Sequence, residues 1–244
     1  MPDIQSDYVE LAVADGSTMR AWHTRPAQHK GQPGLMVFQE AFGVNSHIRS
    51  VADRFAEAGY VVIAPELYHR SAPEFEGKYE DITAAMAQAR QVTPEGLAHD
   101  VRASYEFLQQ SAGDKIACVG YCMGGRVSFV ANVTVPVKAA ASYYGGGLAD
   151  LIGRASDCSA PMLFFWGEQD QHIPSEQRQK VAEGMLESKH QSVQVTFSDA
   201  GHAFFNDQRP SYNPAAAKLA WELTLSFFEQ NLKGRTRITL LAEL

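Results

Sequence analysis

A cysteine flanked by glycines is the residue of this chain with the clearest capacity for chemistry. Cys122 stands in Gly-Tyr-Cys-Met-Gly at 120–124, directly after the short apolar segment 115–119 and before a helix-forming segment. This pattern is typical of a nucleophile elbow, in which a strand turns sharply into a helix and leaves the central side chain protruding. The helix N-terminus favours thiolate over thiol. We therefore predict that Cys122 is a nucleophile, the alternative being a buried structural cysteine.

Two further residues complete a Cys-His-Asp set in the chain order of nucleophile, acid and histidine. Asp170 follows the unbroken apolar run 161–166, and His202 follows the alternating segment 192–197. Both runs are typical of strands, and ligands gather at the carboxyl edge of open α/β sheets. Taken separately, Asp170 would be a turn-capping carboxylate and His202 a loop histidine. Their order and placement together favour a catalytic triad with Cys122.

Seven short motifs spread over nearly the whole chain resemble signatures of the dienelactone hydrolase family, within the α/β-hydrolase superfamily. They are Gln-Glu-Ala-Phe-Gly at 39–43, Ala-Gly-Tyr-Val at 58–61, Ala-Pro-Glu-Leu-Tyr at 64–68, Gly-Tyr-Cys-Met-Gly-Gly at 120–125, Tyr-Tyr-Gly at 143–145, Gly-Glu-Gln-Asp at 167–170 and Ala-Gly-His-Ala-Phe at 200–204. The resemblance implies a carboxylic ester hydrolase of the carboxymethylenebutenolidase type. It implies Cys122 as nucleophile, His202 as base and Asp170 as the residue that orients the histidine.

The resemblance also implies a role for Glu40, because in the family an acidic side chain at this position contacts the resting cysteine and assists its deprotonation. A carboxylate there can accept the thiol proton, yet its negative charge also opposes thiolate formation. The alternative is a surface glutamate at a strand end. The oxyanion hole is expected from the backbone N–H groups of Met123, which follows the nucleophile, and Ala41, which follows the apolar segment 35–39.

The expected reaction is hydrolysis of activated carboxylic esters or enol lactones through a covalent acyl-enzyme. Because thiolate leaves a tetrahedral adduct more readily than alkoxide does, peptide bonds are disfavoured. In the family an arginine four residues after the histidine helps to hold a substrate carboxylate, and here that position is Asn206. This departure weakens the case for dienelactone itself and favours a broad esterase. Candidate substrate-binding residues are Tyr144, Phe204, Asn206 and Arg70, with Arg209 as a second possible source of charge.

Three other activities stay open at this stage. The oxyanion hole can receive a phosphoryl oxygen, so slow attack on activated phosphotriesters is one alternative. A non-catalytic hydrolase-fold protein, which binds a ligand or senses oxidation through its cysteine, is a second. Acyl transfer to an acceptor other than water is a third.

Composition and charge narrow the class of protein. The chain has 244 residues, 45% of them hydrophobic, which suits a single domain over 1–244 with a substantial core. The net charge of −7 and the lack of a basic stripe argue against nucleic acid. We find no leader-like N-terminus and no membrane-spanning run, so a cytoplasmic monomer or homodimer acting on a small ester or lactone is expected. The tail 235–244 does not resemble the family's ending.

No cofactor or metal site is expected. The three cysteines, Cys118, Cys122 and Cys158, form no closely spaced pair, and an odd number without a secretion signal suits a reducing compartment. The eight histidines are scattered and make no His-Glu-x-x-His pattern.

Alternation of apolar strands and helical segments predicts an α/β-hydrolase fold, with a mainly parallel sheet flanked by helices on both faces and an antiparallel hairpin at the N-terminus. Hairpin strands are expected at 8–14 and 18–24, and sheet strands at 35–39, 61–64, 115–119, 137–143, 162–166 and 193–197. Helices are expected at 46–58, 81–91, 94–110, 125–131, 175–187 and 214–232. The irregular segment 68–79 is expected at the rim of the site.

Overall fold

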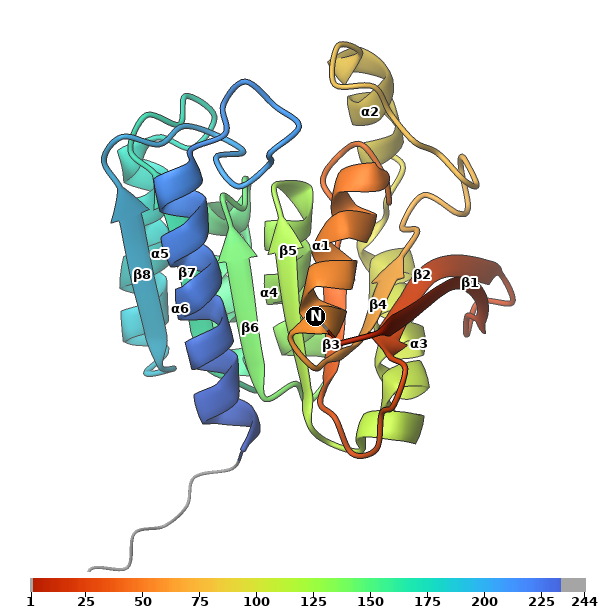
Figure 1. Ribbon diagram of the computed structural model, residues 1–244. Coiled ribbons are helices and arrows are strands. Elements are labelled where there is room, and N and C mark those ends of the chain that lie inside the picture. The colour runs from red at the N-terminus through yellow and green to blue at the C-terminus, as the bar shows by residue number, and fades with distance from the viewer. Residues whose placement is uncertain (1, 234–244) are drawn as a thin grey trace, which may run out of the picture.

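A twisted sheet divides the molecule into two layers of helices in the computed structural model (Figure 1), which describes residues 2–233. The strands are β1 (Ile4–Ala12), β2 (Thr18–Pro26), β3 (Gly34–Phe38), β4 (Val61–Pro65), β5 (Ile116–Tyr121), β6 (Ala139–Tyr143), β7 (Met162–Gly167) and β8 (Ser192–Phe197). The helices are α1 (Ser46–Glu57), α2 (Ile82–Ala89), α3 (Pro94–Ala112), α4 (Met123–Thr134), α5 (Ser175–Glu187) and α6 (Pro214–Leu232), with short 3₁₀ helices η1 (Leu148–Asp150) and η2 (Ile152–Asp157).

The strand order confirms the predicted fold class. The sheet runs β1-β2-β4-β3-β5-β6-β7-β8, in which β1–β2 and β2–β4 are antiparallel and every later pair is parallel. From β3 the chain moves first to β4 on one side and then to β5 on the other. This change of direction opens a crevice at the carboxyl ends of the central strands, where open α/β sheets bind their ligands.

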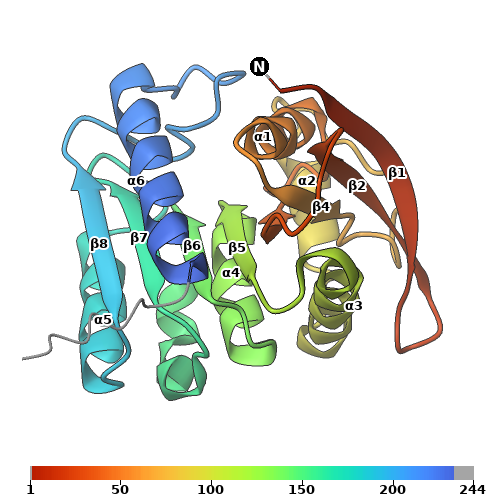
Figure 2. The same cartoon turned by 60° about the horizontal axis from the view of Figure 1, so that its bottom comes forward.

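Helices cover both faces of the sheet. Figure 2 shows α1 and α6 on one face and α3, α4 and α5 on the other, while α2 stands beyond the carboxyl ends of the strands in Figure 1. Because both faces are covered, the central strands β3 to β7 are buried along their whole length, which explains their unbroken apolar sequences. The edge strand β8 is only partly buried, and its burial does not follow the alternation of its sequence, because Val193 is exposed.

Element boundaries differ from the sequence prediction mainly around the elbow. Strand β5 continues through Gly120 and Tyr121 because both residues are paired with neighbouring strands, and α4 begins at Met123, two residues earlier than expected. The hairpin β1–β2 is also longer than predicted. The 3₁₀ helices η1 and η2 were not predicted, since such short turns carry no periodic pattern. The prediction for the tail 235–244 lies outside the described residues.

Candidate active site

The junction of β5 and α4 has the geometry of a nucleophile elbow. Cys122 sits between the two elements with φ 55° and ψ −116°, a left-handed conformation that is uncommon for a non-glycine residue. Its side chain is half-buried, whereas Cys118 and Cys158 are buried. The turn therefore presents the Cys122 sulfur at the carboxyl edge of the sheet and at the first turn of a helix.

The glycines around Cys122 are required by close backbone approaches. A methyl group added to Gly120 would lie 1.9 Å from the carbonyl oxygen of Gly124. One added to Gly124 would lie 2.3 Å from the carbonyl oxygen of Phe38, at the end of the neighbouring strand β3. Neither contact can be relieved by a side-chain movement, because the obstacles are backbone atoms. The glycine pattern thus reflects how tightly α4 packs on the strand ends.

His202 and Asp170, which are 32 residues apart in the chain, form a hydrogen-bonded pair. The Nδ1 atom of His202 lies 2.8 Å from Oδ2 of Asp170, and the other carboxylate oxygen accepts the backbone N–H of His172 at 2.8 Å. Asp170 follows β7 and His202 follows β8, so the carboxyl edge of the sheet brings them together. The buried carboxylate fixes the orientation of the imidazole and leaves Nε2 for another partner.

The surroundings of His202 favour its charged form. Burial disfavours the imidazolium, but the hydrogen bond to Asp170 and the interaction with Cys122 outweigh it and raise the pKa of His202 to about 10. Burial raises the pKa of the Asp170 carboxyl, but the contact with His202 outweighs burial and holds this pKa below its usual range. Such a site favours an imidazolium beside a negatively charged partner.

Glu40 lies in the interior rather than on the surface. Its carboxylate is almost fully buried and accepts a hydrogen bond from Nδ2 of Asn206 at 2.7 Å, with the hydroxyl of Tyr144 3.5 Å from its second oxygen. Since Phe38 pairs with Gly120 in parallel register, and Glu40 and Cys122 each come two positions after these paired residues, both lie at the same edge. Among residues 2–233 no hydrogen bond joins Glu40 to Cys122; the carboxylate is turned toward Asn206.

The two backbone amides expected to form the oxyanion hole both lie at this edge. Met123 is the first residue of α4, and Ala41 is buried in the loop after β3. Within residues 2–233 neither N–H donates to a backbone carbonyl. The hydroxyl of Tyr68 donates to the carbonyl oxygen of Ala41 at 2.9 Å and lies 3.5 Å from Sδ of Met123, so it links the loop after β3 to the start of α4.

The aromatic substrate-binding candidates Tyr144 and Phe204 pack next to His202. The ring of Tyr144 lies 5.1 Å from that of His202 and 5.3 Å from that of Phe204, and both aromatic side chains are fully buried. Burial also raises the pKa of Tyr144 well above its ordinary value, so that it stays a neutral hydrogen-bond donor. Phe204 packs further against Phe197 at 5.1 Å.

The candidate arginine Arg70 is committed to ion pairs. Its guanidinium binds Asp15 at 2.7 Å and Asp100 at 2.8 Å. Arg209 instead lies over the rings of Phe42 and Tyr79, 5.8 and 5.6 Å from their centres. Of the two arginines, only Arg209 has its charge free of a carboxylate in the described structure.

Sequence reasoning missed two tyrosines and a histidine near the triad. Tyr79 accepts a hydrogen bond from Asn206 at 3.0 Å, Tyr68 bridges the oxyanion loops, and His172 lies 5.1 Å from His202, ring centre to ring centre. Tyr68 follows β4 at the carboxyl edge, a placement that could have identified it. Tyr79 ends the irregular segment 68–79, which the sequence places at the rim of the site, although no pattern singles out this residue within the segment. In the part of the chain that the structure describes, no cluster of three or more His, Cys, Asp or Glu side chains is arranged to hold a metal ion. Over the same residues, no helix has the length and apolar character needed to cross a membrane.

Known proteins have similar sequences over most of this chain. The sequence model of the dienelactone hydrolase family matches residues 19–232. A protein of Escherichia coli K12 named "Putative carboxymethylenebutenolidase" is 33% identical over 230 residues, which are 89% of this chain and 84% of the relative. The carboxymethylenebutenolidase of Pseudomonas putida is 31% identical over 229 residues, 90% of this chain and 94% of the relative.

Solved structures of other proteins have the same fold as this chain. The structure named as a putative dienelactone hydrolase from Klebsiella pneumoniae superimposes with a TM-score of 0.86 at 29% identity, covering 93% of this chain and 99% of the other. A dienelactone hydrolase-like promiscuous phosphotriesterase from metagenomic libraries gives a TM-score of 0.82 at 20% identity, covering 93% and 98%. With the family match spanning most of the chain and the sheet order found above, the chain is a hydrolase that belongs to the dienelactone hydrolase family.

Proposed function

We propose that this protein hydrolyses activated carboxylic esters or enol lactones, with Cys122 as nucleophile, His202 as general acid and base, and Asp170 as the residue that orients His202. The observation that carries this proposal is the position of His202. One ring nitrogen is held by the buried carboxylate of Asp170, while the imidazole interacts with the sulfur of a strained elbow cysteine. Nucleophile, base and orienting group are thus linked in series.

In the first half of the reaction the Cys122 thiolate attacks the carbonyl carbon and forms a C–S bond. The carbonyl electron pair moves to oxygen, and the N–H groups of Met123 and Ala41 stabilise the oxyanion, since neither has a backbone acceptor in the described structure. When the tetrahedral adduct collapses, the C–O bond to the leaving group breaks and His202 donates its proton to the departing oxygen. A thioester on Cys122 and a free alcohol or enol result.

In the second half a water molecule attacks the thioester while neutral His202 takes its proton. Collapse of the second adduct breaks the C–S bond and releases the carboxylic acid. The proton remains on His202 and the sulfur leaves as thiolate, which restores the starting ion pair. Because the raised pKa of His202 favours this ion pair, deacylation ends in the state from which the next acylation begins.

Glu40 supports this chemistry as a buried negative charge near the nucleophile. Its hydrogen bonds to Asn206 and Tyr144 hold the carboxylate in place at the same edge of the sheet as Cys122. Glu40, Asp170 and a thiolate at one sheet edge disfavour anionic substrates. We therefore expect neutral activated esters to react faster than esters carrying a second carboxylate.

Burst kinetics with p-nitrophenyl acetate test the mechanism. Wild-type protein should release one equivalent of p-nitrophenol per chain in a burst and carry an acetyl group on the Cys122 peptide in mass spectra. Cys122→Ala should show no burst and lose at least ~10³-fold in kcat/KM. Cys158→Ala is the matched control and should leave both unchanged, because burial raises the pKa of the Cys158 thiol to about 12. Equal turnover by wild type and Cys122→Ala would refute the proposal by assigning the reaction to another group, and absence of turnover in both would favour a binding or sensing role.

Activated phosphotriesters are a second candidate substrate class. A promiscuous phosphotriesterase has the same fold, and an oxyanion hole can also hold a phosphoryl oxygen. Turnover of an aryl phosphotriester that disappears in Cys122→Ala would support this side activity. Turnover that persists in that variant would assign it to another site.

A further inference from the structure

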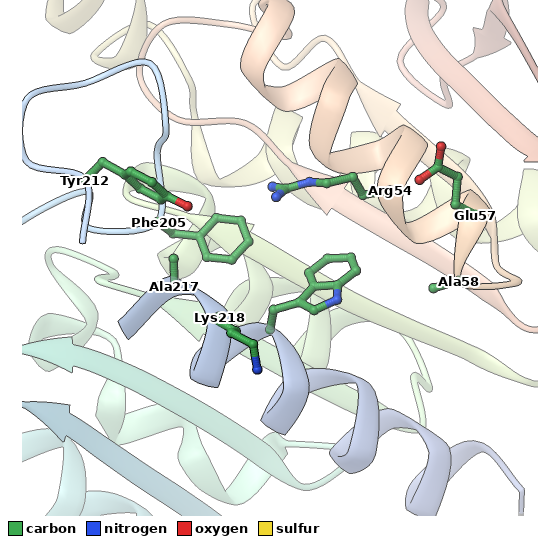
Figure 3. A pocket seen from close by; sticks show the side chains of 8 residues that line it. Arg54, Glu57, Ala58, Phe205, Tyr212, Ala217 and Lys218 are labelled. Atoms are coloured by element: carbon green, nitrogen blue, oxygen red, sulfur yellow. The ribbon is translucent and has the colours of Figure 1, made fainter. Parts of the chain in front are cut away.

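A cavity of about 460 Å³ opens between α1 and α6, away from the triad. Figure 3 shows side chains from both helices and from the loop before α6 around it. Its lining residues are Arg54, Glu57, Ala58, Phe205, Tyr212, Ala217, Lys218 and Trp221. None of Cys122, Asp170 and His202 belongs to this lining, and the volume lies in the range of small-molecule sites.

Arg54 is a cation without a partner in this cavity. Within residues 2–233 its side chain makes no ion pair with a carboxylate, and its Nε atom and one terminal nitrogen are buried without a hydrogen-bond acceptor. Arg70 and Arg49, by contrast, both pair with carboxylates. Enclosing unpaired donors of a charged group is unfavourable, and an anion bound at the other terminal nitrogen would offset that cost by bringing a countercharge to the guanidinium.

The walls of the cavity suit a flat apolar group next to the anion. The guanidinium carbon of Arg54 lies 5.0 Å from the ring centre of Phe205 and 5.4 Å from that of Trp221. Figure 3 shows the guanidinium of Arg54 and the hydroxyl of Tyr212 pointing toward each other across the opening. A carboxylate between them would accept hydrogen bonds from both, while an attached ring would pack on Phe205 and Trp221.

The other charged groups of the lining leave Arg54 as the anion receptor. Lys218 is already paired with Glu222 at 2.5 Å. Glu57 lies one turn further along α1 and forms no ion pair with Arg54 in the described structure, and Figure 3 shows its carboxylate on the side of α1 away from Tyr212.

We propose that this cavity is a second ligand site, which binds a small aromatic carboxylate through Arg54 and Tyr212, with its ring against Phe205 and Trp221. The positive charge of Arg54 favours a carboxylate, because the planar guanidinium can donate to both carboxylate oxygens. The aromatic walls select a ring over an aliphatic chain. This inference is independent of the hydrolytic mechanism, since none of its groups belongs to the triad.

Calorimetric titration of the full-length protein with 2-naphthoate tests the proposal, with 2-naphthamide as a neutral probe of the same shape. Naphthoate should bind one molecule per chain at least tenfold more tightly than naphthamide. Arg54→Met should weaken naphthoate binding at least tenfold and leave naphthamide binding unchanged. Arg102→Met removes an exposed positive charge from α3 and should leave both affinities unchanged.

Two further variants keep the test decisive. Tyr212→Phe removes only a hydroxyl from a partly exposed ring and should weaken naphthoate two- to tenfold even if Arg54→Met is poorly folded. Cys122→Ala should bind naphthoate like wild type. Absence of binding to wild type, equal affinity for the amide, or full binding by both Arg54→Met and Tyr212→Phe would overturn the proposal. Loss of binding in Cys122→Ala alone would overturn it as well, by assigning the ligand to the triad.

Discussion

Two of the aspartate–histidine pairs near the carboxyl edge of the sheet behave in opposite ways. His202 and Asp170 are 2.8 Å apart, and His47 and Asp207 are 3.2 Å apart, with Nδ1 as the bonded atom in both. The pKa of His202 is raised to about 10, whereas burial lowers the pKa of His47 despite the nearby Glu40 and Asp207. The same two residue types thus give a charged histidine in one place and a neutral one in the other.

The difference comes from what surrounds each pair. The side chain of Asp170 is 1% exposed and has a second donor in the His172 N–H, so its charge acts on His202 through a poorly screened medium. The side chain of Asp207 is 47% exposed, so water screens it. His202 also interacts with the Cys122 sulfur, while within residues 2–233 Nε2 of His47 is buried without a partner. Of the two histidines, only His202 therefore has the surroundings that the proposed acid–base role requires.

Replacing each histidine with glutamine should separate the two pairs most strongly. His202→Gln removes the proton carrier and should lower kcat for p-nitrophenyl acetate by about 10³- to 10⁴-fold. His47→Gln, the matched control, should change kcat less than about threefold. Steady-state kinetics on both variants check this, and a comparable loss in His47→Gln would show that the second pair also takes part in turnover.

Replacing each aspartate with asparagine gives the next largest contrast. Asp170→Asn removes the charge that orients His202 and favours its imidazolium, and should lower kcat about 10²- to 10³-fold and shift the histidine titration to lower pH. Asp207→Asn should leave kcat and the His202 titration unchanged. Histidine resonances followed by NMR against pH provide the measurement, and an unshifted His202 in Asp170→Asn would contradict the electrostatic explanation.

Asn206, the residue before Asp207, donates a hydrogen bond to Glu40. Asn206→Leu removes the 2.7 Å donor of a buried carboxylate and should lower the free energy of unfolding by about 2–3 kcal/mol. In a Glu40→Gln background the same substitution should cost about half as much, because the charge that needed the donor is gone. Urea unfolding of the four proteins measures this coupling, and additive losses would mean that the two side chains do not depend on each other.

The smallest expected difference between His47 and His202 is in how each makes the stability of the protein depend on pH. His47 has a lowered pKa in the folded state, so its contribution is complete above the ordinary value near 6.5 and is lost as pH falls toward the lowered value. Wild type should therefore lose stability between pH 7 and 5 more steeply than His47→Gln, by at most about 1.4 kcal/mol per pH unit. His202 has the opposite sign, because its contribution is present below pH 6.5 and is lost as pH rises through about 10. Parallel melting curves for wild type and His47→Gln over pH 5–7 would remove His47 from this account.

Much of the fold could be predicted because its signals are local. Apolar runs and helical periodicity identified every strand of the described sheet, and within residues 2–233 the only elements overlooked were the 3₁₀ helices. The candidate triad could be chosen because Cys122, Asp170 and His202 each follow a strand, and parallel strands end at one edge. Their catalytic roles stay predictions until the kinetics above are measured.

The sequence by itself determined the family, the sheet and which residues stand at its carboxyl edge, because these depend on patterns within short segments. Which side chains contact each other was decided only by the tertiary structure. Asn206 meets Glu40 across 166 positions, Arg70 is held by Asp100, and Arg54 meets aromatic rings without a carboxylate partner in the described structure. Such partnerships arise from side chains that converge from distant segments. Their burial, rather than their residue type, sets the charge that each one carries.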